Sequence, residues 1–70
     1  MEQKTIDNNF TYHTPTDKTI PLFETIRNDG KNFATIIMKL CPESREKSIA
    51  LRKLEEAVMW ANASIARNKP

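Results

Sequence analysis

The sequence predicts an all-α protein, an antiparallel helical hairpin preceded by an extended N-terminal arm. Two long segments carry apolar residues at helical spacing, and only a short connection separates them. The second segment, residues 44–68, contains neither glycine nor proline. Its apolar positions follow one another at spacings of three and four, the period of one helical face. These positions are Leu51, Leu54, Val58, Ala61 and Ile65.

Residues 20–41 are predicted to form the first helix. Pro21 suits the first helical turn, where its missing N–H is not needed. Because the apolar phase is unchanged across Gly30, we expect one continuous helix. A glycine there permits a kink or a close helix crossing. The expected inward stripe is Leu22, Ile26, Phe33, Ile37 and Leu40.

The connection between the helices is only a few residues long. Cys41 and Pro42 end the first helix, and Ser44 is the expected N-cap of the second. Glu46 lies in the first turn, where the helix dipole favours a negative charge. A connection this short places the two helices antiparallel.

Residues 1–19 are predicted to form the arm. Residues 1–9 are polar and aperiodic, so we expect them to be flexible or held only by a partner. Phe10 to His13 form a small aromatic island, followed by a turn or extended linker at residues 14–17. Phe10 either clamps the arm to the helices or serves a site. Tyr12 is an amphipathic ring on a loop, which suits stacking on a planar ligand.

Composition restricts the class of protein. The chain has 70 residues, a net charge of +2 and a single cysteine, so one small domain, 1–70, is expected without an internal disulfide. No apolar run reaches the roughly 18 residues of a membrane span, and the N-terminus does not resemble a secretory signal. The residues suggest no catalytic group, metal site or cofactor.

A domain this small often gains stability by oligomerising. Met59 and Trp60 widen the apolar face of the second helix beyond what one partner helix covers.

Four stretches carry a family resemblance. They are FTYH at residues 10–13, CPESREKS at 41–48, LEEAVMWANA at 54–63 and IARN at 65–68. Together they resemble the helical-hairpin family shared by phage anti-CBASS and Thoeris-anti-defence sponges. Members of that family sequester the cyclic nucleotide signals of bacterial defence systems without cleaving them. The resemblance covers roughly residues 10–68.

The two branches of the family imply different ligands. The anti-CBASS branch implies a compact hexamer of hairpins, with cyclic dinucleotides bound between protomers and cyclic trinucleotides in separate pockets. The Thoeris branch carries an additional N-terminal β domain and binds cyclic ADP-ribose isomers. The short length of this chain favours the anti-CBASS branch.

The resemblance implies a cyclic dinucleotide site between protomers. Tyr12 from two chains would stack on the two bases, with Phe10 nearby. Arg27 and Lys31, one helical turn apart, would meet the phosphates. Arg27 has the alternative of pairing with Glu24, three residues earlier. His13 is either a hydrogen-bond donor to the ligand or an anchor of the arm.

The end of the second helix is implied to form a second, cyclic trinucleotide pocket. Arg67 can hold phosphates with two parallel hydrogen bonds, and Asn68 and Ser64 accompany it. The alternative role of Arg67 is to compensate the helix dipole. Trp60 is expected to serve packing rather than the ligand. Asn62 is expected to be a buried polar specificity element or a partner for the loop.

These observations predict a phage-encoded sponge that acts in the host bacterial cytoplasm. It is expected to be a homo-oligomer, a hexamer in the anti-CBASS pattern, that binds cyclic dinucleotides such as cGAMP and also cyclic trinucleotides. We expect no enzymatic activity and no membrane, DNA or RNA partner. The alternatives are a sponge for cyclic ADP-ribose isomers and a small helical protein-interaction adaptor. A hydrolase of the same messengers is a weaker alternative.

Overall fold

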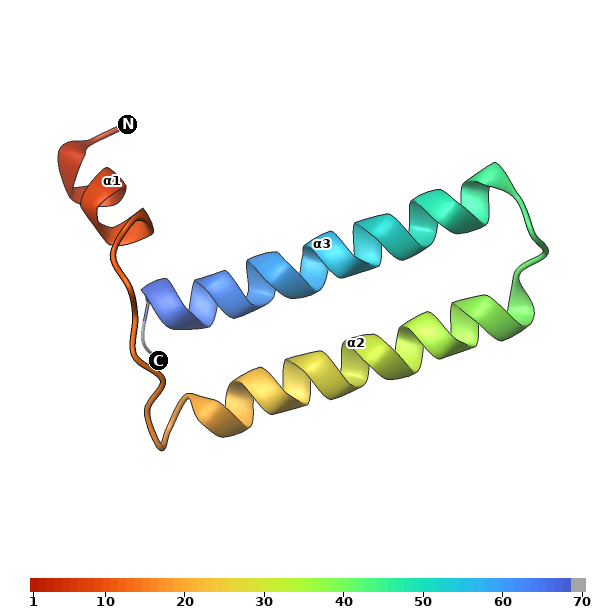
Figure 1. Cartoon of the computed structure of the whole chain (residues 1–70), viewed down its shortest axis with the longest axis horizontal. Coiled ribbons are helices and arrows are strands. Elements are labelled where there is room, and N and C mark those ends of the chain that lie inside the picture. Colours follow the sequence, from red (N-terminus) through yellow and green to blue (C-terminus); the bar gives the residue numbers. More distant parts are fainter. Residues whose placement is uncertain (69–70) are drawn as a thin grey trace.

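The computed structural model describes residues 1–68 as three helices, with no strand in that range. Helix α1 spans Gln3–Asn9, α2 spans Ile20–Leu40 and α3 spans Arg45–Arg67. Helices α2 and α3 lie side by side and antiparallel, which confirms the predicted all-α hairpin (Figure 1). Helix α1 stands beyond the C-terminal end of α3, and the connecting segment passes that end on its way to α2 (Figure 1). Residues 69–70 of the expected domain lie outside the described residues.

The prediction that residues 1–9 lack regular structure was wrong, because Gln3–Asn9 form α1. The Gln3 side chain donates to Asp7 Oδ1 at 2.8 Å, one turn along the helix. Thr11 Oγ1 donates to the Asp7 carbonyl oxygen at the other end of α1. Ile6 is the only apolar residue of the helix, so the segment has no apolar period that a sequence could reveal. Residues 10–18 are non-helical, as predicted.

Two threonines start α2. The Thr16 backbone N–H donates to Thr19 Oγ1 at 2.8 Å, and the Thr19 N–H donates to Thr16 Oγ1 at 3.2 Å. This reciprocal pair satisfies the backbone N–H groups of Thr16 and Thr19 in the turn that leads into α2, whereas the Thr19 side chain makes no cap hydrogen bond to the helix itself. It also explains how the polar Thr19 side chain can be buried.

The turn between α2 and α3 is fixed by Ser44 and Lys47. Ser44 Oγ accepts from the Lys47 N–H at 3.1 Å, which confirms the predicted N-cap. The buried Lys47 ammonium donates to the Met38 carbonyl oxygen at 3.1 Å and to the Glu43 carboxylate at 2.6 Å. The hydrogen bond from Lys47, reinforced by its charge, lowers the pKa of Glu43 below its ordinary value of 4.5. A carboxyl with a lowered pKa stabilises the fold above its ordinary pKa, and this contribution is lost as the pH falls through the lowered value.

The two long helices come into close contact at Gly30. A Cβ atom on Gly30 would lie 2.5 Å from Val58 Cγ2, so the glycine allows the close crossing that the sequence suggested. Helix α2 continues through Gly30 without interruption, as predicted. Ala34, one turn later, is half-buried on the same side. Small residues therefore set the distance between the helices.

With this crossing, α2 is turned about its own axis, so the residues that face α3 differ from the predicted inward stripe. Ile37 is buried and Ile26 half-buried, as expected, but Phe33 and Leu40 are 54% and 77% exposed. Leu22 is also exposed, at 38%. The prediction assumed that the largest apolar side chains face the partner helix. The Gly30 approach to Val58 instead turns the small residues inward and leaves Phe33 and Leu40 outside.

Replacing Gly30 with alanine should destabilise the hairpin, although alanine favours a helix by about 1 kcal/mol over glycine. The new methyl group would overlap Val58 Cγ2, and a valine side chain has little rotameric freedom in a helix. Overpacking of this kind costs roughly 1–3 kcal/mol, so the net expected loss is up to ~2 kcal/mol. Urea unfolding monitored by circular dichroism measures the change. In the Val58→Ala background the same replacement should become stabilising, and destabilisation in that background would contradict the proposed overlap.

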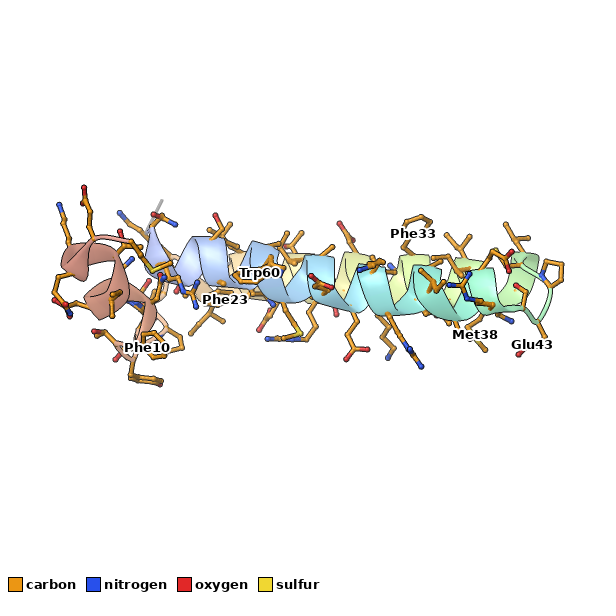
Figure 2. All side chains as sticks on the ribbon, turned by 90° about the horizontal axis from the view of Figure 1, so that it is seen from above. Phe10, Phe23, Phe33, Met38, Glu43 and Trp60 are labelled. Carbon is orange, nitrogen blue, oxygen red and sulfur yellow. The ribbon has the colours of Figure 1, made fainter. Side chains whose placement is uncertain are left out.

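The hairpin is one helical layer thick. The chain measures 44 × 30 × 15 Å, and Ile37 is the only buried apolar residue among residues 1–68. The predicted α3 stripe, from Leu51 to Ile65, is only half-buried by α2. Figure 2 shows Phe33 and Met38 projecting from opposite sides of the layer, and both are more than half exposed. Both faces of the hairpin therefore carry apolar surface that one chain does not cover.

No helix within residues 1–68 combines the length and the apolar character that a membrane span requires.

Candidate functional site

A cavity of about 920 Å³ lies between α1 and the C-terminal end of α3. Ser64, Arg67 and Asn68, the three residues predicted for a second pocket, all line it. Ser64 and Arg67 are three positions apart on α3 and so lie on one face of the helix. Trp60 and Ala63 complete the α3 side of the cavity. The structure therefore brings this predicted group of residues together.

Helix α1 supplies the opposite wall, which the sequence interpretation missed. Asn8 Nδ2 donates to the Arg67 carbonyl oxygen at 3.1 Å, and this bond ties α1 to the end of α3. The two residues are 59 positions apart, and α1 is polar and aperiodic, so no local sequence pattern indicates the contact. The other lining residues on this side come from α1 and the positions that flank it: Glu2, Lys4, Thr5, Asp7, Asn9 and Thr11.

Arg67 and Trp60 form the polar and aromatic parts of this cavity. The guanidinium carbon of Arg67 lies 6.0 Å from the centre of the Trp60 ring, within the range of a cation–π contact. Trp60 is 60% exposed and lies on the side of α3 that faces away from α2 (Figure 2). Within one chain Trp60 therefore does not pack against α2. Arg67 also occupies the last turn of α3, where a positive charge complements the helix dipole.

The aromatic residues of the arm lie outside both cavities. Phe10 and Tyr12 are 87% and 80% exposed, so Phe10 does not clamp the arm to the helices. His13 is half-buried, and its ring N–H donates from Nε2 to the Asn8 carbonyl oxygen at 2.8 Å. His13 therefore anchors the arm to α1. The two exposed rings remain accessible to a second molecule.

Arg27 and Lys31 line a second cavity, a groove of about 400 Å³ between α2 and α3. The ion pairs within residues 1–68 do not include Arg27, so the alternative pairing with Glu24 is not made. Glu55 is the one acidic residue along the groove, against the two basic ones. The rest of the lining is apolar or glycine: Gly30, Ala34, Leu51, Leu54, Val58 and Met59. The groove thus combines an apolar floor with a net positive charge, but Tyr12 does not reach it within one chain.

Asn62 is a half-buried polar residue of α3. Its Oδ1 atom is buried and has no hydrogen-bond partner within residues 1–68, so Asn62 is not a partner for the loop through that atom. In the same range, no group of three or more histidine, cysteine or acidic residues is arranged to hold a metal ion.

Comparison with curated proteins and with solved structures gave no match. Comparison with protein families did, and the matching family is described as the Acb2/Tad1 hairpin domain. The match covers residues 1–66, which include α1, the arm, α2 and nearly all of α3. It confirms the resemblance to the sponge family that the sequence motifs indicated. The chain thus belongs to the Acb2/Tad1 hairpin family.

Proposed function

We propose that this protein is a phage-encoded sponge that binds cyclic oligonucleotide messengers in the host bacterial cytoplasm and sequesters them without cleavage. The family match supports sequestration of cyclic nucleotides as the general function. The observation that carries the proposal further is the cavity between α1 and α3, where Ser64, Arg67 and Asn68 lie together beside an aromatic ring. Its volume of about 920 Å³ lies within the usual range of small-molecule sites.

The cavity between α1 and α3 is proposed as the cyclic trinucleotide site. Arg67 can donate two parallel hydrogen bonds to a phosphate, and Ser64 and Asn68 add further polar groups. The Arg67 side chain takes part in neither of the ion pairs found in residues 1–68, so a phosphate can recruit it without breaking one.

The second proposed site takes cyclic dinucleotides and forms only between protomers. Arg27 and Lys31 line the positively charged groove, whereas Tyr12 and Phe10 extend from the arm into solvent. A cyclic dinucleotide has approximate two-fold symmetry, and a two-fold interface presents every residue twice. Two copies of Tyr12 could then stack on the two bases while basic residues of the grooves meet the phosphates. The His13 anchor limits the movement of the arm that carries Tyr12.

Oligomerisation follows from the uncovered apolar surface. One chain buries a single apolar residue among those described, while Phe33, Ile36, Leu40 and Met59 are all about half exposed or more. A chain of this size needs further burial to be stable. We propose a homo-oligomer, a hexamer in the anti-CBASS pattern, in which other copies cover these surfaces.

Calorimetric titration with a panel of cyclic dinucleotides, cyclic trinucleotides and cyclic ADP-ribose isomers tests the proposal. The expected result is tight binding, where a one-nanomolar Kd corresponds to about 12 kcal/mol. One dinucleotide per two chains supports the two-fold site, and one trinucleotide per three chains supports a site at a three-fold meeting of chains. Native mass spectrometry measures the oligomer in parallel. Intact ligand should be recovered after the complex is denatured.

Three other results would contradict parts of the proposal. Linear product in the recovered ligand would show cleavage rather than sequestration. Binding of cyclic ADP-ribose isomers alone would assign the protein to counteract Thoeris rather than CBASS. The absence of heat with every ligand, from a folded oligomer, would favour the protein-interaction adaptor, which the exposed apolar faces also suit.

A further inference from the structure

We propose that Trp60 is the stacking platform for a nucleobase in the cavity between α1 and α3, and that it gives this cavity a preference for purines. The inference rests on the proposed function, because it specifies what part of a cyclic nucleotide the cavity recognises. Sequence spacing alone suggested a packing role for Trp60. Four features of the structure assign it to the ligand instead.

The first feature is the position of Trp60 on α3. Trp60, Ser64 and Arg67 are spaced by four and three residues, which places them on one helical face. This face is distinct from the half-buried stripe that meets α2, and the indole is 60% exposed. An exposed tryptophan that lines a cavity beside polar groups is the arrangement typical of a binding site.

The second feature is the balance of charge around the cavity. Glu2 and Asp7 oppose Lys4 and Arg67, so the charged side chains of the lining sum to zero. A cavity without net positive charge gains little general attraction for a polyanion. Binding there must depend on local contacts, and the largest apolar surface of the lining belongs to Trp60. Stacking is sequence-tolerant but stronger for larger ring systems, which favours purines.

The third feature is that a cation already occupies the space over the indole. The Arg67 guanidinium lies 6.0 Å from the ring centre. A phosphate offers this guanidinium a stronger, charge-assisted partner than the ring does. When Arg67 turns to the phosphate, the ring face becomes free for a base of the same ligand.

The fourth feature is the wall of α1 opposite the ring. Asn9 is half-buried and lines the cavity, and its amide offers both donors and an acceptor for the edge of a base. The bond from Asn8 to the Arg67 carbonyl oxygen holds α1 in place beside the platform. The cavity thus presents a ring, an amide and a guanidinium, which match the face of a base, its edge and its phosphate.

The protein offers a direct optical test, because Trp60 is the only tryptophan of the sequence. Intrinsic fluorescence and calorimetry are recorded while cyclic tri-AMP or cyclic tri-UMP is added to the full chain. Cyclic tri-AMP should quench the emission in a saturable manner and bind more tightly than cyclic tri-UMP. Trp60→Leu should weaken cyclic tri-AMP binding about 5- to 150-fold for each base that loses its stack on an indole. Trp60→Phe retains a smaller ring and should retain most of the affinity.

Arg52→Ala is the control, since it shortens an exposed side chain on the same helix, outside both cavities. It should leave cyclic tri-AMP affinity and tryptophan quenching unchanged. The oligomer mass of every variant is measured by native mass spectrometry and should equal that of the wild type. A Trp60→Leu variant that dissociates would make Trp60 an interface residue and overturn the proposal.

The remaining outcomes separate this proposal from the proposed function. If wild-type protein binds cyclic tri-AMP without a change in emission, or if Trp60→Leu binds it equally well, the platform is refuted while sequestration stands. The same holds if the protein binds another member of the panel but not cyclic tri-AMP. If no cyclic nucleotide binds, the proposed function fails and the platform fails with it.

Discussion

Replacing Tyr12 with alanine is expected to abolish or strongly weaken cyclic dinucleotide binding while leaving the helices and the assembly intact. Tyr12 is 80% exposed, and its side chain makes no hydrogen bond within residues 1–68, so its removal should cost the fold little. Each base–aromatic stack contributes roughly 1–3 kcal/mol, and a two-fold site would lose two of them. The expected loss is about 2–6 kcal/mol, or at least ~30-fold in Kd. Calorimetric titration with cyclic dinucleotides measures it.

Two controls accompany this variant. Tyr12→Phe keeps the ring and should keep most of the affinity, and circular dichroism should show equal helix content in all three proteins. Cyclic trinucleotide binding should be unchanged in Tyr12→Ala, because Tyr12 does not line the cavity between α1 and α3. Unchanged dinucleotide affinity would show that Tyr12 is not part of the dinucleotide site.

Replacing Leu54 with alanine is expected to destabilise the protein by roughly 2–5 kcal/mol and to shift the assembly towards smaller species. Leu54 is only half-buried within one chain, where the removed carbons would account for about 1 kcal/mol. The larger value is expected because another copy should cover the groove in which Leu54 lies. Denaturant unfolding at several protein concentrations gives the free energy, and native mass spectrometry gives the distribution of species.

Arg52→Ala serves as the control on the exposed side of α3, where a substitution should change stability by no more than about 0.5 kcal/mol. A Leu54→Ala oligomer with wild-type mass and stability would show that the predicted stripe faces solvent in the assembly. An effect of only about 1 kcal/mol without dissociation would show that α2 alone covers Leu54.

The parts of the fold that could be predicted depend on contacts and patterns among residues that lie close together in the sequence. The Ser44 cap contacts Lys47, three residues away, and unbroken helical phase predicted one helix across Gly30. The rotation of α2 could not be predicted in the same way. It depends on the contact between Gly30 and Val58, which exists only once the helices are packed. Helix α1 was missed because polar hydrogen bonds, rather than an apolar period, distinguish it.

The candidate site could likewise be predicted only where its residues lie close together in the sequence. Ser64 and Arg67 share a helical face, so their meeting in one cavity follows from their spacing on α3. The contribution of α1 depends on Asn8 meeting the far end of the chain, which no local pattern encodes. The proposed meeting of Tyr12 with Arg27 and Lys31 depends on how two chains pack, and a single sequence contains no direct signal of such packing.

The thinness of the hairpin has a consequence for dosage. In the proposed oligomer, a layer 15 Å thick with one buried apolar residue among residues 1–68 would depend on neighbouring copies for its stability, so its folded fraction would rise with protein concentration. For sites that form only between copies, the number of competent sites then increases more steeply than the amount of chain synthesised. A sponge built in this way has little capacity at the first few copies per cell and gains it abruptly once expression passes a threshold. The timing of synthesis during infection, as well as affinity, would then decide how much messenger is removed.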